Sequence, residues 1–364
     1  MFKKLHAIGL IGLISISFSV LAQDKVLNVY NWAEYTAPET IPGFESKTGI
    51  KVRYDVYDSN DVLQAKLLTG KSGYDIVVPS THYASRQLQA GLFQKLDKAA
   101  IPNLKNLDPE IMKLLDGVDP GNQYFVPWGF GTNGLGFNVT KAKEILGADV
   151  DLADWSIFFD PEKIKKFESC GISVLDEAAQ VFPAALHYLG KNPNSNNPQD
   201  YRDALALLKK IRPYIRQFSS SGYIDELASS DLCMVYAYSG DVMIAARKAR
   251  EAKRDYVINY FIPKGGAPAW FDVMAIPKDA PNPAGANAFI NYIETPEVHA
   301  AITNKMFYPN ANKAARALVV AEVANNPSIY PPQEVSQTLF VIQAQPLDVQ
   351  RLQTRLWAEL KSGR

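Results

Sequence analysis

The chain has little of the residue types that mark several common classes of protein. Of its 364 residues, only two are cysteine and four are histidine. Its 38 basic and 38 acidic residues balance, so it lacks the basic excess expected of a nucleic-acid-binding protein, and we expect no nucleic-acid partner. Beyond residue 22 there is no apolar run of 18 residues, so we expect no membrane-spanning helix there. The remaining composition, 47% hydrophobic and 21% charged, is that of a globular protein whose length suggests two domains.

Residues 1–22 have the pattern of a secretory signal peptide. Two lysines precede an apolar stretch that ends in Val20-Leu21-Ala22. Small residues three places and one place before the cut are what signal peptidase accepts, so we predict cleavage after Ala22 and a periplasmic mature protein. An uncleaved membrane anchor is the alternative. No cysteine stands directly after the apolar stretch, where a lipid anchor would need one.

The two cysteines, Cys170 and Cys233, form an even pair. In an oxidising compartment such a pair indicates a disulfide, although two buried free thiols remain an alternative. No histidine after residue 22 has a ligand-type spacing to a cysteine or to another histidine, so we expect no metal site.

No motif for catalysis stands out. The sequence has no nucleophile elbow, and the segment Gly134-Leu135-Gly136 lacks the full dinucleotide fingerprint. We therefore expect a protein that is not an enzyme and that carries no cofactor. A periplasmic enzyme is the alternative from another functional class.

Hydrophobic periodicity alternates between the pattern of strands and the pattern of helices along the chain. This alternation predicts an α/β protein with parallel sheets covered by helices. A last helix carries Val349, Leu352, Leu356 and Leu360 on one face. The predicted strands are 27–32, 51–57, 74–79, 172–175, 232–238, 256–262 and 270–276, and the other helices are 38–48, 60–69, 82–89, 176–189, 199–218, 241–251 and 285–293.

Two segments rich in glycine, 127–134 and 263–266, separate the two series of elements. We interpret them as crossings between two lobes. After the signal peptide, the N-terminal lobe would contain 23–131 and 264–310, and the C-terminal lobe 132–263 and 311–364. Because ligands bind at the carboxyl ends of strands and between domains, the predicted site is the cleft between the lobes.

Aromatic and acidic side chains gather in the predicted loops beside this cleft. Aromatic rings attract cations, and carboxylates accept charge-assisted hydrogen bonds from ammonium groups. The combination favours a slim organic cation as ligand. Each residue also has an ordinary interpretation: packing for a tryptophan, a solvated hydroxyl for a tyrosine, helix capping for Asp241. The residues are Trp32, Glu34, Tyr35, Tyr238, Asp241, Trp270 and Asp272.

Several motifs, in the same order, resemble the periplasmic putrescine/spermidine-binding proteins of ABC importers, and most closely their putrescine-binding branch. The resemblance covers essentially the whole chain after residue 22. It implies a two-lobed α/β solute-binding fold of class II type with two crossing segments, which closes around a polyamine and docks on a membrane permease. We also expect a monomer. The motifs are VYNWAEY (29–35), YDVYDSN (54–60), YDIVVPS (74–80), FDV (271–273), FYPNANK (307–313) and IYPP (329–332).

The resemblance also implies roles for individual residues. Those that match the family's ligand-contacting positions are Trp32, Tyr35, Ser80, Asp241, Trp270, Asp272 and Tyr308, and Cys170 and Cys233 match its cysteine pair. Departures are Gln180 where the putrescine binders have Glu, Tyr238 for Trp, Ala33 for Ser, Glu34 for Asp, and Trp270 for Phe.

We accordingly assign three kinds of contact. Trp32, Tyr35, Tyr238 and Trp270 would form the walls of the site. Asp272, Asp241 and Glu34 would hold ammonium groups, and Ser80, Gln180 and Tyr308 would supply neutral hydrogen bonds.

Some of these assignments have alternatives. Glu177, one helical turn before Gln180, would replace the missing acid or serve only as an acid at a helix N-terminus. Another small amine or an amino acid derivative is the alternative ligand. Sensing of a polyamine is the alternative to transport.

Overall fold

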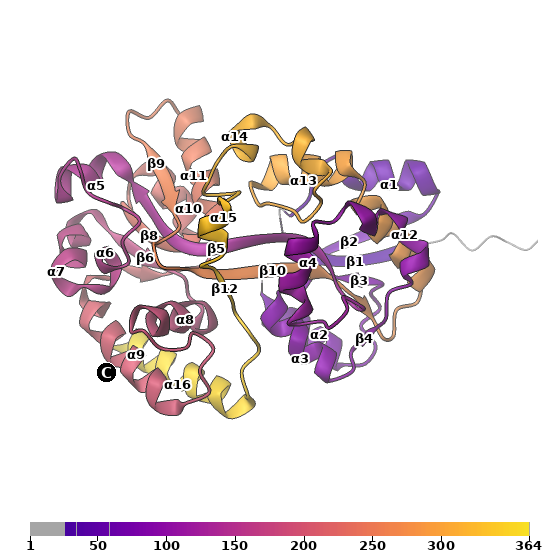
Figure 1. Ribbon diagram of the computed structural model, residues 1–364, viewed down its shortest axis with the longest axis horizontal. Helices are drawn as coiled ribbons and strands as arrows, with labels where there is room; N and C mark the ends of the chain where they lie inside the picture. Colours follow the sequence, from indigo (N-terminus) through magenta and orange to yellow (C-terminus); the bar gives the residue numbers. More distant parts are fainter. Residues whose placement is uncertain (1–25, 34, 58, 364) are drawn as a thin grey trace, which may run out of the picture.

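The computed structural model describes residues 26–33, 35–57 and 59–363. The predicted signal peptide, residues 1–22, and Glu34 lie outside these residues. Two lobes lie side by side along the long axis of the molecule, and long strands run from one to the other (Figure 1). No helix of the described part is both long and apolar enough to span a bilayer.

The first lobe is built on a small parallel sheet of order β2-β1-β3. The strands are β1 (Val26–Trp32), β2 (Lys51–Tyr57) and β3 (Ile76–Val77), and β1 alternates buried and less buried residues as a strand with one covered face should. A two-stranded sheet pairs β4 (Phe93–Gln94) with β11 (Ile276–Pro277). The helices are α1 (Thr40–Thr48), α2 (Asn60–Leu68), α3 (Thr81–Gln89), α4 (Pro109–Asp116), α12 (Pro283–Ile293) and α13 (Pro296–Met306), with short 3₁₀ turns at Lys98–Ala100 and Pro102–Asn106.

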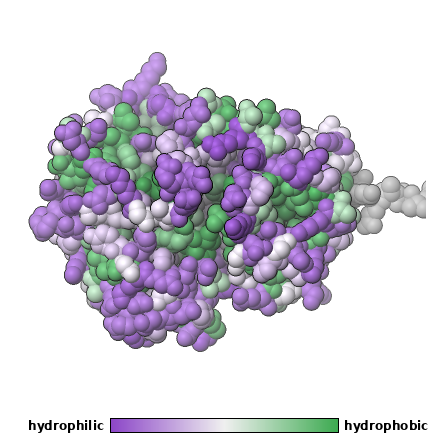
Figure 2. Space-filling model, viewed as in Figure 1, coloured by the Kyte–Doolittle hydropathy of each residue, from purple (hydrophilic) through white to green (hydrophobic). Residues whose placement is uncertain are grey.

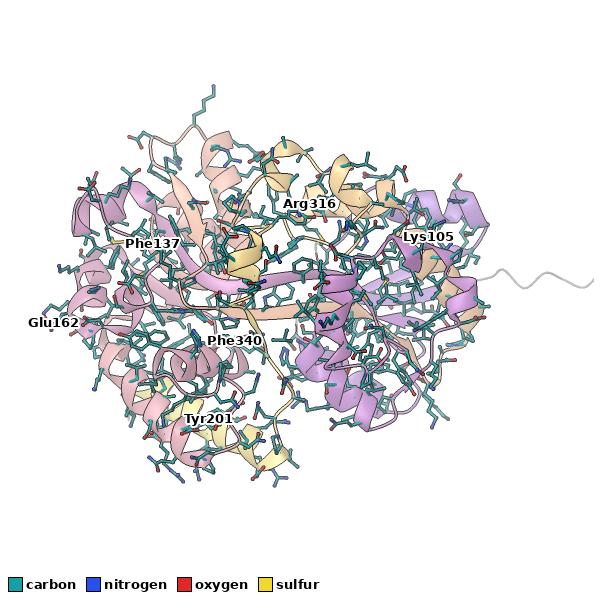
Figure 3. The ribbon with its side chains drawn as sticks, in the orientation of Figure 1. Lys105, Phe137, Glu162, Tyr201, Arg316 and Phe340 are labelled. Carbon is teal, nitrogen blue, oxygen red and sulfur yellow. A yellow bond between two sulfur atoms is a disulfide. The ribbon has the colours of Figure 1, made fainter. Side chains whose placement is uncertain are left out.

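The second lobe contains the larger hydrophobic core, to which Phe137 and Tyr201 both belong (Figure 3). Its strands are β6 (Ile172–Val174), β7 (Gln217–Phe218), β8 (Met234–Tyr238) and β9 (Ile258–Phe261). Its helices are α5 (Val139–Leu146), α6 (Ser156–Phe159), α7 (Pro161–Ile164), α8 (Ala178–Tyr188), α9 (Pro198–Ile211), α10 (Tyr223–Ser229), α11 (Ser239–Glu251) and α16 (Leu347–Ser362), with 3₁₀ turns at Lys165–Cys170 and Arg212–Tyr214.

Two antiparallel strands connect the lobes. In β5 (Val126–Asn138) the first half pairs with β10 (Pro268–Met274) and the second half with β8. The strand β5 contains the first predicted crossing segment, 127–134. The second connecting strand is β10, and the predicted segment 263–266 forms a turn before it.

The end of the chain returns to the crossing before it enters the second lobe. The strand β12 (Phe340–Val341) pairs in parallel with β10, and Figure 3 shows Phe340 close to the crossing strands. The segment before it contains α14 (Ala321–Ala324), α15 (Gln333–Ser336) and a 3₁₀ turn at Ala315–Leu318. The predicted residue boundaries between the lobes stay a prediction.

The predicted disulfide is present. Cys170 and Cys233 are bonded, with their Cα atoms 5.7 Å apart. The bond joins the end of a 3₁₀ turn to the residue just before β8, both in the second lobe. The alternative of two free thiols is therefore wrong.

Most predicted elements are confirmed to within about two residues, and the exceptions have local causes. The helix predicted over 199–218 is wrong at its end: α9 stops at Ile211, and Phe218 belongs to β7. Pro213 explains this, because proline lacks the backbone N–H that a helix interior needs. The strand predicted over 74–79 pairs only at Ile76–Val77. The all-parallel expectation is also incomplete, because β5 is antiparallel to β8, β9 and β10.

Candidate ligand-binding cleft

A cavity of about 920 Å³ lies between the two lobes. Hydrophilic residues cover most of the face seen in Figure 2, and hydrophobic residues appear in the middle, where the lobes meet. Nine of the ten predicted site residues line this cavity, and the tenth, Glu34, lies outside the described residues. The nine are Trp32, Tyr35, Ser80, Gln180, Tyr238, Asp241, Trp270, Asp272 and Tyr308.

Asp272 on β10 is buried and held by two hydroxyl groups. Ser80 Oγ donates a hydrogen bond of 2.6 Å to one carboxylate oxygen, and Tyr35 Oη donates one of 2.8 Å to the other. Burial raises the pKa of Asp272 to about 6, against the opposite effect of these two hydrogen bonds. A nearby positive charge would favour the ionised carboxylate.

Other side chains fix both donors to Asp272. Asn60 bonds Ser80 twice: its Nδ2 donates to Ser80 Oγ over 3.1 Å, and its Oδ1 accepts from the Ser80 backbone N–H over 3.1 Å. The indole N–H of Trp128 donates to the backbone oxygen of Tyr35 over 3.1 Å. The carboxylate is therefore held in a prearranged position.

Asp241 lies near the start of α11 and is also held by two hydroxyl groups. Tyr308 Oη and Tyr223 Oη each donate a hydrogen bond of 2.7 Å, one to each carboxylate oxygen. Burial raises the pKa of Asp241. The helix begins at Ser239 and the residue before it, Tyr238, makes no side-chain cap, so the proposed capping role of Asp241 is not what the structure shows.

Glu177, at the start of α8, also lines the cavity with its carboxylate. Its Oε2 accepts a 3.0 Å hydrogen bond from Tyr238 Oη, and its Oε1 lies 3.4 Å from His82 Nε2 across the cleft. Its side chain makes no capping bond to the helix. Its carboxylate therefore interacts with residues of both lobes.

Aromatic rings form much of the remaining wall. The Trp270 ring centroid lies 5.2 Å from that of Tyr308 and 5.8 Å from that of Tyr238. Gly131 stands opposite Trp270 in the β5–β10 pair, and a Cβ there would lie 2.6 Å from the indole. Glycine at this position therefore leaves room for the ring. Trp32 packs on Tyr57, with ring centroids 4.7 Å apart.

Sequence reasoning missed two residues that shape the site. Tyr223 donates a hydrogen bond to Asp241, but nothing in the sequence around it distinguishes it from a tyrosine that only packs in a helix. Asn133 lies in the glycine-rich crossing segment, and it bonds both Trp270 and Gln180. Among the described residues, no group of three or more His, Cys, Asp or Glu side chains is placed to hold a metal ion.

The comparisons with known proteins agree with this architecture. Residues 39–331 match the family model for bacterial extracellular solute-binding proteins. The putrescine-binding periplasmic protein SpuD of Pseudomonas aeruginosa is 47% identical over 362 residues, which are 100% of this chain and 98% of that protein. The putrescine-binding periplasmic protein PotF of Escherichia coli is 48% identical over 355 residues, 97% of this chain and 96% of that protein.

A solved structure supports the same assignment. It is described as a putative spermidine/putrescine ABC transporter from Listeria monocytogenes, with a TM-score of 0.81 and 31% identity over 93% of this chain and 100% of that chain. The named relatives are binding proteins, not enzymes, and SpuD and PotF are periplasmic. The chain therefore belongs to the family of bacterial extracellular solute-binding proteins.

Proposed function

We propose that this protein captures a polyamine, either a putrescine-like diamine or spermidine, in the cavity between its lobes and delivers it to an ABC importer. The observation that carries the proposal is the pair Asp241 and Asp272. Both line the cavity, and neither forms an ion pair with a described residue. Burying an unpaired carboxylate costs free energy, which a ligand ammonium group would recover by supplying the opposite charge.

The rings around these carboxylates suit the rest of such a ligand. The methylene groups of a polyamine would pack against Trp270 and Tyr308, and its ammonium groups would lie over ring faces. Each such cation–π contact contributes about 0.5–2 kcal/mol, depending on desolvation. Trp32, Tyr35 and Tyr238 would complete the walls. Ser80 would add a neutral hydrogen bond, and Gln180 would add one to any ligand group that accepts a hydrogen bond. Glu34 remains a proposed ammonium ligand.

Closure of the two lobes would couple binding to delivery. Asp272 lies on the connecting strand β10 and Glu177 at the start of α8 in the second lobe, and both line the cavity. A ligand that contacts both favours the closed arrangement by its extra affinity for that state. The lobes would be 23–131 with 264–310 and 132–263 with 311–364.

The names of the relatives support a periplasmic setting, and the pattern of residues 1–22 supports export. The chain would be exported by its first 22 residues, cleaved after Ala22, and would act as a monomer in the periplasm. It would bind ligand without chemical change and pass it to a membrane permease.

Calorimetry of the mature protein tests the proposed ligand class. The panel is putrescine, cadaverine, spermidine, agmatine and γ-aminobutyrate. We expect at least one polyamine to bind with micromolar or tighter affinity. Absence of binding by every amine would overturn the proposal. Loss of polyamine uptake on deletion of the gene, restored by the wild-type protein, would separate transport from sensing.

A further inference from the structure

Two consecutive hydrogen bonds, from Trp270 to Asn133 and from Asn133 to Gln180, fix the orientation of the Gln180 amide. The first begins at Trp270, whose indole N–H can only donate a hydrogen bond. Trp270 Nε1 lies 3.0 Å from Asn133 Oδ1, so this atom of Asn133 must be the carbonyl oxygen. The ordinary ambiguity of an asparagine amide is thereby removed.

The orientation of Asn133 in turn fixes that of Gln180. With its oxygen directed at Trp270, Asn133 directs its Nδ2 at Gln180 Oε1, 2.6 Å away. A flip of the Gln180 amide would place two N–H donors against each other. Gln180 therefore uses its carbonyl oxygen within the protein. Asn133 is fully buried, so no solvent competes for this arrangement.

The amide nitrogen of Gln180 remains free to bind a ligand. Gln180 lines the cavity, and its Nε2 has no hydrogen-bond partner among the residues that the structure describes. This nitrogen is therefore in contact with solvent, since it is not among the fully buried polar atoms without a partner. The hydroxyl of Tyr236 also donates to the backbone oxygen of Gln180 over 2.7 Å, which fixes this turn of α8.

We propose that Gln180 presents an N–H donor to the cavity, so that this position selects a ligand group that accepts a hydrogen bond. An ammonium group offers only N–H donors and cannot pair with Nε2. The favoured ligand is then an amine with an ammonium group for the carboxylates and a carbonyl oxygen for Gln180, such as an N-acylated diamine. This inference rests on the proposed function and names the ligand class more closely.

The test compares two ligands with the same chain, putrescine and N-acetylputrescine, which differ in whether the second end is an ammonium group or an amide. Calorimetry gives the ratio of their dissociation constants. We expect the wild-type protein to bind N-acetylputrescine at least as tightly as putrescine. Gln180→Glu would keep an oxygen for Asn133 and place a second, charged oxygen toward the cavity. We expect it to shift the ratio at least tenfold toward putrescine.

Two further variants support the comparison. Gln333→Glu adds the same charge on the exposed helix α15, outside the cavity, and should leave the ratio unchanged. Trp270→Phe removes the N–H that fixes Asn133, so both amides become free to flip. We expect this variant to bring the affinities for putrescine and N-acetylputrescine closer together. The loss of part of the ring wall affects both ligands, so a change in the ratio of their dissociation constants reports the orientation of the Gln180 amide.

The outcomes separate the two proposals. If Gln180→Glu and Trp270→Phe fold and bind but leave the ratio unchanged, the donor assignment of Gln180 is wrong and the proposed function stands. If neither the wild-type protein nor any variant binds an amine, the proposed function fails and this inference with it.

Discussion

Ser80 and Asp272 are 192 residues apart in the chain, and Ser80 Oγ donates a hydrogen bond of 2.6 Å to the Asp272 carboxylate. The same two residues form an isolated antiparallel bridge between the start of α3 and the crossing strand β10. The first lobe and the crossing therefore meet at a buried acid. A shift of β10 relative to the first lobe would therefore change the hydrogen bonding of the Asp272 carboxylate.

Asp272→Asn should weaken putrescine binding at least tenfold, because it removes the charge that faces the ligand. The unliganded protein should keep its melting temperature within a few degrees, since the neutral amide replaces a buried carboxylate that forms no ion pair with a described residue. Calorimetry and thermal unfolding measure the two effects. Asp225→Asn is the matched control: Asp225 also lines the cavity, but it is exposed and paired with Lys248 at 2.6 Å. Equal losses in both variants would contradict the role of Asp272.

Polyamine affinity should fall as the pH drops through 6, approaching tenfold per pH unit below it. The pKa of Asp272 is raised to about 6 in the empty protein, so below this pH a proton must leave before a cation can pair with the carboxylate. Titrations between pH 5 and 8 measure the trend. The trend should be weaker in Asp272→Asn.

The same raised pKa has the opposite effect on the unliganded protein. Between about pH 4 and 6 the folded state holds a proton on Asp272 that the unfolded state has lost. The contribution of this group to the free energy of unfolding therefore decreases as the pH rises through that window. The difference between wild type and Asp272→Asn in urea unfolding, measured at pH 4.5 and 7, isolates this contribution. A difference that does not vary with pH would contradict it.

Gly131→Ala should displace the Trp270 ring, because the added methyl group would lie 2.6 Å from it. We expect a loss of about 1–3 kcal/mol in stability, as for other overpacked positions, together with weaker ligand binding. Urea unfolding, calorimetry and intrinsic fluorescence measure these changes. Gly117→Ala is the control, since its nearest atom is Leu114 O at 3.6 Å. If the two variants lose stability and affinity equally, a glycine at position 131 is not needed to accommodate the Trp270 ring.

Replacing both cysteines by alanine should lower the free energy of unfolding by about 4 kcal/mol. The disulfide spans a sequence separation of 63, and a closed loop of that size limits the unfolded chain. Neither cysteine lines the cavity, so polyamine affinity should change less than threefold. Urea unfolding and calorimetry test both statements. An unchanged unfolding midpoint would show that the bond adds no stability.

Periodicity and motifs predicted the two-lobed α/β fold, the first crossing and most of the elements. Local rules were sufficient there, because strands such as β1 and helices such as α16 carry their own hydrophobic pattern. Gly265 and Gly266 mark a turn as well as a crossing, and pairing with β5 places the second connecting strand after them. Residues of the cavity could be named from aromatic and acidic loops, but Tyr223 and Asn133 could not.

The sequence alone determined which chemical groups this protein can offer: rings, acids and amides at the ends of predicted strands. Only the tertiary structure decided what each group has left to offer a ligand. Asp272 is bonded by Ser80 and Tyr35, and Gln180 has given its oxygen to Asn133. The physical reason is that a hydrogen-bonding side chain has few donors and acceptors, and partners distant in the sequence determine which of them remain free.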